Sequence, residues 1–292
     1  MTTGQDSVRA ALRLEPGRPA DPTAIDPAAI PIGPASKRKA VKDAGRVAPE
    51  LDGLQEALYA EGVAGGGRRR LLLVLQGMDT SGKGGTIRHV AGVFNPQGLH
   101  IASFKKPTPE ELRQHFLWRI RKQVPSPGMI GVFDRSHYED VLIVRVNQLV
   151  PEAVWRPRYD EINDFEASLV ADGFTVVKCF LHISPQEQRE RLLARLDDPA
   201  KHRKYNPADV DARAKWNDYQ LAYAEALQRC GTASAPWYLI PSDRKWYRNW
   251  AVTRILLETL RELHPRYPPA RFDVAAERAR LADGPTLTRR TS

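Results

Sequence analysis

The sequence predicts an α/β protein whose doubly wound parallel sheet lies between two layers of helices. Short apolar runs alternate along the chain with longer segments of helical periodicity, which is the pattern of successive β-α-β units. The run Leu-Leu-Leu-Val-Leu at residues 71–75 is apolar at consecutive positions, as expected for a central strand covered on both faces. A glycine-rich turn follows this run directly, and a helical pattern follows the turn. Strands that are separated by helices in this way pair in parallel.

The elements follow one another regularly along residues 36–263. A helix starts near residue 36, and leucines at 51, 54 and 58 keep helical spacing until the glycines at residues 62–67 end it. Beyond it we expect strands at residues 71–75, 100–104, 129–133, 174–183 and 237–240. We expect one helix each at residues 82–93, 109–124, 185–196, 208–229 and 246–263, and more than one helix across residues 137–171.

Two terminal regions flank this domain, which spans residues 36–264. Six prolines between residues 16 and 34 cannot sustain a long helix, so residues 1–35 are expected to form a loosely packed, extended arm. Residues 265–292, which carry arginines at 278, 280, 289 and 290, are expected to form a solvated tail.

Composition limits the class of protein. The chain has 292 residues, of which 42% are hydrophobic, and its longest unbroken apolar run is too short to cross a bilayer. The N-terminus has no recognisable secretory signal, and two cysteines, Cys179 and Cys230, are too few for a disulfide framework. We therefore expect buried, reduced thiols and a cytoplasmic location. The 44 Lys and Arg against 35 Asp and Glu give a net charge of +9, which favours an anionic partner without identifying it.

The strongest motif is Gly77-Met-Asp-Thr-Ser-Gly82-Lys83, between the predicted central strand and the next helix. In this context the pattern is typical of a phosphate-binding loop (P-loop, Walker A), whose amides and helix N-terminus face the anion while the lysine contacts phosphate oxygens. The predicted phosphate-binding residues are Gly77, Gly82, Lys83, Gly84, Gly85 and Thr86. The alternative is a glycine-rich turn that binds nothing.

The loop departs from the usual pattern at the metal-binding position. Ser or Thr ordinarily follows the lysine and ligates Mg²⁺, but Gly84 stands there. Asp79, inside the loop, can replace it as a ligand of Mg²⁺, or of Mn²⁺ as a substitute; the alternative is a turn-forming aspartate. Asp134 ends the strand predicted at residues 129–133, which is where phosphate-loop folds place a second metal-holding aspartate.

Arginines near these acids suit phosphoryl transfer. Arg135 follows Asp134 and can neutralise a phosphoryl group in flight, unless it only forms an ion pair with a neighbouring acid. Arg191 and Arg195 lie one helical turn apart and lead into a basic loop, and residues 197–212 suit a lid that closes over phosphates and excludes water. The alternative is a solvated basic surface loop.

Several segments together resemble the second polyphosphate kinase family. They are GMDTSGKGGTIRHV at residues 77–90, NPQG at 95–98, FDRSHYEDV at 133–141, FLHIS at 180–184, the basic loop of the lid, and WNDYQLAYAEAL at 216–227. The resemblance covers about residues 36–263. It implies a thymidylate-kinase-like fold and the Mg²⁺-dependent transfer of a terminal phosphoryl group between inorganic polyphosphate and nucleotides.

The resemblance also implies residue roles. Asp79 and Asp134 match the metal-binding carboxylates of the family, and Lys83 and Arg135 match the residues that stabilise the transferred phosphoryl group. Arg195 matches a lid arginine.

Further basic residues match less closely. Lys201 and Lys204 match the basic pair of the lid, and Lys105 and Lys106 fall where the family carries a basic residue near its chain-binding channel, although ordinary surface lysines are the alternative there. Arg203 stands where the family often has Trp, which leaves the packing of the lid open.

The nucleotide site is assigned to Tyr138, Glu139 and Arg191. The sequence His-Tyr-Glu after Ser136 resembles the branches of the family that accept monophosphates more than the branch restricted to diphosphates. We therefore expect AMP, ADP or both as acceptors, and ATP or ADP as products.

Three functions fit a basic, phosphate-binding chain. A polyphosphate-dependent nucleotide kinase is favoured, with inorganic polyphosphate and nucleoside mono- or diphosphates as partners, no nucleic acid or membrane partner, and a homo-oligomer, dimer or tetramer, as the assembly. An ATP-dependent P-loop kinase of a nucleotide or metabolite is the alternative, against which Gly84 and Asp79 argue. A non-catalytic polyanion-binding protein is disfavoured, because Asp79 and Asp134 would repel a bare polyanion unless a metal ion intervened.

Overall fold

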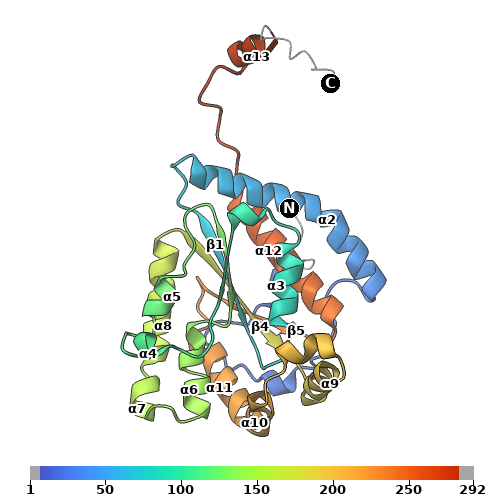
Figure 1. Cartoon of the computed structure of the whole chain (residues 1–292), viewed down its shortest axis with the longest axis vertical. Coiled ribbons are helices and arrows are strands. Elements are labelled where there is room, and N and C mark those ends of the chain that lie inside the picture. Colours follow the sequence, from blue (N-terminus) through green and yellow to red (C-terminus); the bar gives the residue numbers. More distant parts are fainter. Residues whose placement is uncertain (1–6, 283–292) are drawn as a thin grey trace, which may run out of the picture.

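A five-stranded parallel sheet forms the centre of the computed structural model, which describes residues 7–282 (Figure 1). The strand order is β2-β3-β1-β4-β5. The strands are β1 (Arg70–Gln76), β2 (Leu99–Ser103), β3 (Ile130–Asp134), β4 (Phe174–His182) and β5 (Trp237–Pro241). The predicted three-layer parallel fold is confirmed.

Strand β1 is buried on both faces, as its unbroken apolar run predicts. Leu72 and Val74 belong to one hydrophobic cluster, and Leu71, Leu73 and Leu75 belong to the other. All five side chains are 0% exposed. At about 25 cal/mol per Å² of buried apolar surface, such a strand stabilises both layers at once. The sheet is thereby fixed around the strand that leads into the phosphate loop.

Helices cover the two faces of the sheet (Figure 1). On one face, α2 (Lys37–Val63), α3 (Lys83–Ala91) and α12 (Lys245–Leu263) bury apolar side chains against β1 and β4. On the other face, α8 (Arg158–Ala171) and α11 (Trp216–Arg229) do the same. The shorter helices are α4 (Pro109–Leu112), α5 (Trp118–Arg121), α6 (Ile143–Val146) and α7 (Glu152–Trp155), and the 3₁₀ turns are η2 (Pro96–Gly98) and η3 (His137–Asp140). Within residues 7–282, no helix combines the length and the apolar character needed to cross a membrane.

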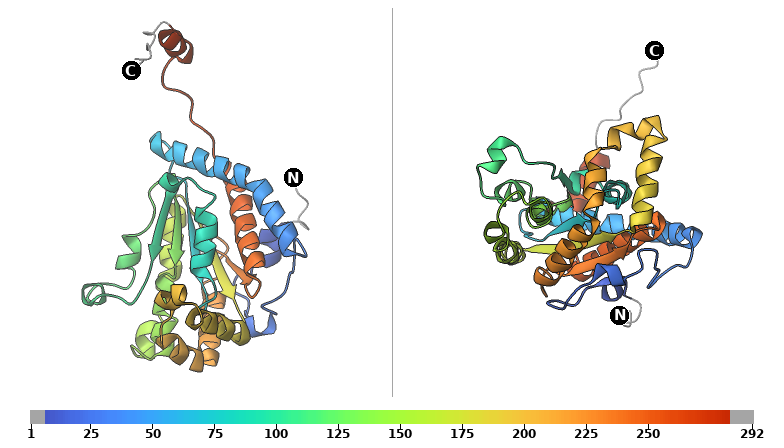
Figure 2. Two further views of the ribbon diagram at one scale, coloured as in Figure 1. Left: turned by 45° about the vertical axis from the view of Figure 1, so that its right-hand side comes forward. Right: turned by 90° about the horizontal axis from the view of Figure 1, so that it is seen from below.

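The lid segment, residues 197–212, lies beyond the carboxyl ends of the strands. It follows α9 (Pro185–Leu196) and contains η4 (Pro199–Lys204) and the start of α10 (Ala208–Ala214). Seen toward the strand ends (Figure 2, right), the lid segment and the segment that carries α4 project on opposite sides of the sheet. Both flank the edge at which the loop after β1 lies.

Two predicted helices are wrong in their continuity. The helix expected over residues 109–124 is split into α4 and α5, because Nδ1 of His115 accepts from the amide of Leu117 (3.3 Å) while its carbonyl accepts from the amide of Trp118 (2.8 Å). A side chain that hydrogen-bonds its own backbone in this way competes with the helix. The helix expected over residues 208–229 breaks at Lys215, whose backbone (φ −97°, ψ 26°) leaves the helical region and whose Nζ donates to Asn147 Oδ1 (2.7 Å).

The prediction of a loosely packed N-terminal arm is wrong for residues 7–35. Helix α1 (Val8–Leu12) buries both its terminal residues, and the 3₁₀ turn η1 (Pro22–Ala24) buries Pro22. The amide of Leu14 donates to the carbonyl of Trp237 (2.9 Å), which places the arm against the outer edge of β5. Glu258 of α12 accepts from the first amides of α1. The prolines exclude a long helix, but they do not prevent this packing.

The C-terminal region contains a helix, α13 (Val274–Ala282), that has no buried residue. It stands apart from the sheet at the end of an extended segment (Figure 1). Residues 266–276 and 278–282 are exposed, and the arginines at 289 and 290 lie outside the described residues.

Both thiols should be inert in the folded protein. Cys179 and Cys230 are 0% exposed, and burial raises the pKa of each thiol, that of Cys230 to about 12. We expect iodoacetamide at pH 8 to leave the native protein unlabelled and to alkylate both thiols in denaturant, as measured by intact mass. Labelling of the native protein at the denatured rate would contradict this burial.

Candidate functional site

The phosphate loop, residues 77–82, joins β1 to α3 and needs glycine at both ends. Gly77 has φ +149° and Gly82 has φ +108°, both in a region that L-residues rarely adopt. A Cβ on Gly77 would lie 2.5 Å from the carbonyl oxygen of Leu181, and one on Gly82 would lie 1.6 Å from Nη1 of Arg248. The backbone therefore approaches its neighbours more closely than any side chain would permit.

Lys83 opens α3 and turns back over the loop. Its Nζ donates to the carbonyls of Gly77 (2.7 Å) and Met78 (3.3 Å). Burial and the nearby Arg135 guanidinium lower the pKa of this ammonium group. Phosphate oxygens are stronger acceptors than these carbonyls, so the ammonium group can donate to a phosphate bound in the loop instead.

Asp79 forms an ion pair with Arg135. Arg135 Nη2 lies 2.6 Å from Asp79 Oδ1. Burial alone would raise the pKa of Asp79, but the charges of Lys83 and Arg135 outweigh it, so the pKa lies below its usual range. The carboxylate stays ionised, as a metal ligand must be. Gln188 of α9 steadies the same residue by donating to the Asp79 carbonyl (3.1 Å).

Asp134 ends β3 with a half-buried carboxylate. Its neighbours in the sheet are Leu75 and Ser103, so it lies beside the point where β1 enters the phosphate loop. Within residues 7–282 its carboxylate has no hydrogen bond or ion pair, and its charge acts on Lys83. No described cluster of three or more His, Cys, Asp or Glu could hold a metal ion alone. This donor set suits Mg²⁺, which usually binds one or two carboxylates and completes its shell with water and substrate phosphates.

Arg135 has an unusual backbone that the neighbouring turn supports. Its φ is +64°, a left-handed conformation that costs a non-glycine residue free energy. Ser136 then caps η3. With its oxygen toward Ser136, the amide of Gln76 accepts from Ser136 N and Oγ (3.2 and 3.1 Å), and its nitrogen donates to Glu139 Oε1 (3.2 Å). Burial raises the pKa of Glu139, against the opposing charge of Arg135.

Two residues assigned to the nucleotide, Arg191 and Tyr138, are buried and hydrogen-bonded within the protein. Arg191 is 8% exposed, and its guanidinium donates to Glu187 and to the carbonyls of Thr80, Ser81, Ser242 and Asp243 (2.6–3.0 Å). It therefore ties the backbone of the phosphate loop to the segment that follows β5. Tyr138 is 0% exposed, and its hydroxyl donates to Glu166 (2.8 Å).

Thr86, which is predicted to bind phosphate, uses its hydroxyl inside α3. Thr86 Oγ1 donates to the Gly82 carbonyl (3.2 Å), and the side chain is 0% exposed. Gly84 and Gly85 are exposed on the first turn of α3, next to the loop.

Arg195 and Asp209 form an ion pair between α9 and the lid segment. Arg195 donates to Asp209 Oδ2 (3.1 Å) and to the Lys204 carbonyl (2.7 Å). Asp209 is 7% exposed, and burial together with the charge of Asp79 raises its pKa. The lid therefore approaches the phosphate loop through Asp209 and Arg195.

The four lysines predicted to bind polyphosphate are all exposed. Lys105 and Lys106 are exposed after β2, and the Lys105 carbonyl accepts from Arg119 (2.8 Å). Lys201 and Lys204 are exposed on η4, and Lys201 pairs with Asp198 (2.8 Å).

Sequence reasoning missed three residues that support the site. Gln76 links β1 to Glu139, Asp209 holds Arg195, and Arg248 of α12 donates to the Ser81 carbonyl (3.2 Å) beside Arg191. Asp209 follows the basic loop and Gln76 follows the apolar run of β1, so their places next to predicted site segments could have identified both as supporting residues. Nothing in the local pattern around Arg248 points to the loop.

The structure thus brings together Asp79, Lys83, Asp134, Arg135 and Glu139, with Arg195 at the lid. This set neutralises and orients phosphates, and it contains no nucleophile activated by a base. It fits phosphoryl transfer, which depends on positioning and charge.

Comparisons with known proteins agree with this chemistry. The model of the family described as polyphosphate kinase 2 matches residues 35–268. An AMP/ADP-polyphosphate phosphotransferase of Meiothermus ruber is 50% identical over 218 residues, which are 75% of this chain and 80% of that protein. An ADP-polyphosphate phosphotransferase of Rhodopseudomonas palustris is 43% identical over 236 residues, 76% of this chain and 80% of that protein. The crystal structure of a polyphosphate kinase 2 from Arthrobacter aurescens TC1 has a TM-score of 0.91 and 47% identity, and the match covers 95% of this chain and 97% of that chain.

Proposed function

The chain belongs to the polyphosphate kinase 2 family, and we propose that it transfers the terminal phosphoryl group of inorganic polyphosphate to AMP as well as to ADP. The protein is a polyphosphate-dependent nucleotide kinase. The observation that carries the reaction is the Asp134 carboxylate, which lies beside the phosphate loop without a partner in residues 7–282 while Asp79 is held by Arg135.

The roles of the residues follow from their positions. The loop amides and Lys83 would hold the donor phosphates, and Asp79 and Asp134 would hold Mg²⁺, which when bound withdraws charge from phosphate oxygens. A phosphate oxygen of the nucleotide attacks the terminal phosphorus, the bridging P–O bond breaks, and the shortened polyphosphate leaves with that bridging oxygen. Arg135 would neutralise the phosphoryl group in flight.

The lid supplies the last part of the proposal. Arg195 can exchange Asp209 and the Lys204 carbonyl for a phosphate, because its present contacts are one carboxylate and one carbonyl at the mouth of the site. Closure of the lid would keep water from accepting the phosphoryl group. The alternative of an ATP-dependent kinase has no support in the family match.

Acceptor choice is the finer part of the proposal. The relative with 50% identity is named for both AMP and ADP, and Glu139 is a half-buried carboxylate beside the transfer residues. The test incubates the pure protein with Mg²⁺, long-chain polyphosphate and either AMP or ADP, and separates nucleotides by chromatography. We expect ADP and then ATP from AMP. ATP from ADP alone would restrict the acceptor to diphosphates, and no product in either tube would overturn the proposal.

The basic lid pair should act on the donor. We expect Lys201→Ala with Lys204→Ala to raise the KM for polyphosphate about fivefold and to leave the KM for the nucleotide unchanged, because both side chains are exposed on the lid segment that carries the Arg195 contact. The control, Arg278→Ala with Arg280→Ala, removes the same charge from α13, at the other end of the molecule (Figure 1). Equal KM values for polyphosphate in the two variants would show that Lys201 and Lys204 contribute no more to donor binding than other surface charges do.

We also propose a homo-oligomer. Leu149, Val154 and Leu221 remain 47–62% exposed around α6, α7 and α11, and a second copy would bury them. Light scattering on the eluting protein tests this, and a monomer at micromolar concentration would contradict it.

A further inference from the structure

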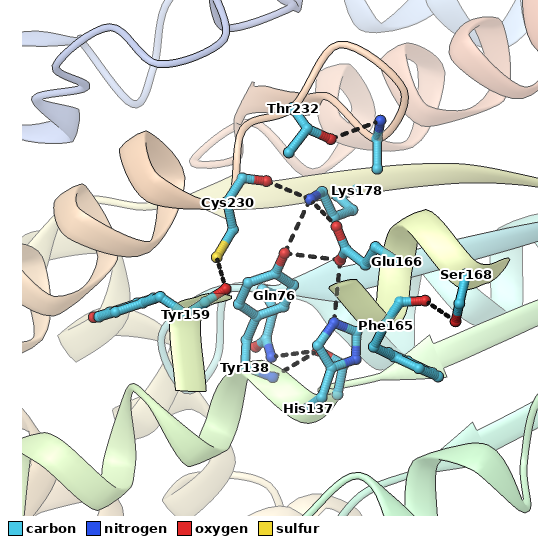
Figure 3. A network of polar contacts seen from close by, with 12 residues as sticks. Gln76, His137, Tyr138, Tyr159, Phe165, Glu166, Ser168, Lys178, Cys230 and Thr232 are labelled. Carbon is cyan, nitrogen blue, oxygen red and sulfur yellow. Dashed lines mark hydrogen bonds and ion pairs between the residues drawn. The ribbon is translucent and has the colours of Figure 1, made fainter. Parts of the chain in front are cut away.

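Behind the site lies a fully buried polar cluster, Lys178, Glu166, His137 and Tyr138 (Figure 3). These four side chains are 0–1% exposed. Lys178 Nζ lies 2.5 Å from Glu166 Oε2, and Glu166 Oε1 accepts from the Tyr138 hydroxyl (2.8 Å) and faces His137 Nε2 (3.1 Å). We call this set the buried cluster.

The ammonium group at its centre is completely satisfied. Besides Glu166, Lys178 donates to the Tyr138 hydroxyl (2.9 Å) and to the Cys230 carbonyl (2.6 Å). Its three donors thus bind one carboxylate, one hydroxyl and one carbonyl from three different segments. A buried charge persists only with such partners.

The cluster holds one short stretch of chain. His137 and Tyr138 are the first residues of η3, and they follow directly on Arg135, with its φ of +64°, and Ser136. Glu166 on α8 and Lys178 on β4 belong to the rigid scaffold. From the other side, Gln76 at the end of β1 binds Ser136 and Glu139. The turn that carries two candidate site residues is therefore fixed from both sides.

Stability alone does not account for this arrangement. A buried ion pair contributes little net stability compared with apolar side chains of similar volume, because desolvation offsets the attraction. Hydrogen bonds are directional, so they fix the orientation of a turn more closely than apolar contacts do. A strained residue such as Arg135 persists only where its surroundings determine its conformation.

We propose that the buried cluster is a positioning device for phosphoryl transfer: it fixes η3 and thereby sets the Arg135 guanidinium toward Asp79. Because its four residues are 0–1% exposed, we assign them no contact with the substrate. The inference rests on the proposed function, in which Arg135 neutralises the transferred phosphoryl group.

The test removes one hydroxyl. We expect Tyr138→Phe to lower kcat about tenfold and to leave both KM values within about twofold, because the loss falls on the transition state. Amide hydrogen exchange at residues 135–139 should become faster in the same full-length variant. The matched control is Tyr238→Phe, which removes the hydroxyl of an equally buried tyrosine, an acceptor for Arg9 Nε of the arm (3.1 Å); its kcat and its exchange at residues 135–139 should stay unchanged.

A second variant separates positioning from folding. Glu166→Met with Lys178→Met removes both charges together, so no charge is left unpaired, and we expect a cooperative thermal transition with kcat lowered at least tenfold. An unchanged kcat in both variants, an equal loss in Tyr238→Phe, or a raised nucleotide KM with normal kcat in Tyr138→Phe would overturn the proposal. An inactive wild type would overturn the proposed function instead, and hydrogen exchange would still decide whether the cluster holds the turn.

Discussion

Asp134→Asn is expected to lower kcat by about 10³-fold while the protein stays folded. The carboxylate lies at the end of β3, beside the phosphate loop, without a hydrogen bond or ion pair in the described part of the chain. Its removal therefore breaks no contact that stabilises the fold. An amide of the same shape binds Mg²⁺ far more weakly than a carboxylate does, so the transferred phosphates lose charge neutralisation. The measurement is kcat with saturating polyphosphate and ADP, together with the melting temperature.

The control for this variant is Asp164→Asn. Asp164 is exposed on α8, and the substitution makes the same chemical change away from the loop. Activity should match the wild type. Near-normal activity of Asp134→Asn would refute the metal assignment, and a loss of activity accompanied by a lower melting temperature would indicate a structural role.

Arg135→Lys should lower kcat about 10²-fold with small changes in either KM. Lysine keeps the positive charge but loses the planar pair of donors that matches phosphate oxygens. At φ +64° lysine meets the same backbone strain as arginine, so the comparison isolates the guanidinium. Initial rates across both substrate concentrations give the kcat and the two KM values.

Arg156→Lys serves as its control. Arg156 is exposed and forms ion pairs with Glu152, one helical turn away, and with Glu225 (3.3 Å); such surface pairs contribute less than about 1 kcal/mol each. Both the activity and the stability of this variant should match the wild type. If Arg135→Lys were equally neutral, the guanidinium would have no part in the transfer step.

The loop and its acids could be predicted because their signals are local. The apolar run of β1, the two glycines and Lys83 are consecutive, and Asp134 with Arg135 ends a second apolar run. Parallel strands bring such ends to one edge, so local patterns define a shared site.

Other features depend on long-range partners that no local pattern reveals. Arg191 has helical spacing with Arg195, yet the carbonyls it binds come from the phosphate loop and from residues 242–243. Tyr138 directly precedes the site residue Glu139, yet Glu166 and Lys178 hold it inside the protein. The packing of the arm depends in the same way on β5 and α12, which follow more than 200 residues later.

The contact between the arm and β5 bears on aggregation. Strand β5 ends the sheet, and Arg13 forms an antiparallel bridge with Tyr238 along its outer side. Without residues 7–14, the Trp237 carbonyl would lose the Leu14 amide, and the apolar surface beneath α1 would be uncovered. An open strand edge of this kind recruits strands from other molecules. Residues 7–14 thus cover this strand edge, and a form without them would be prone to self-association through its own sheet.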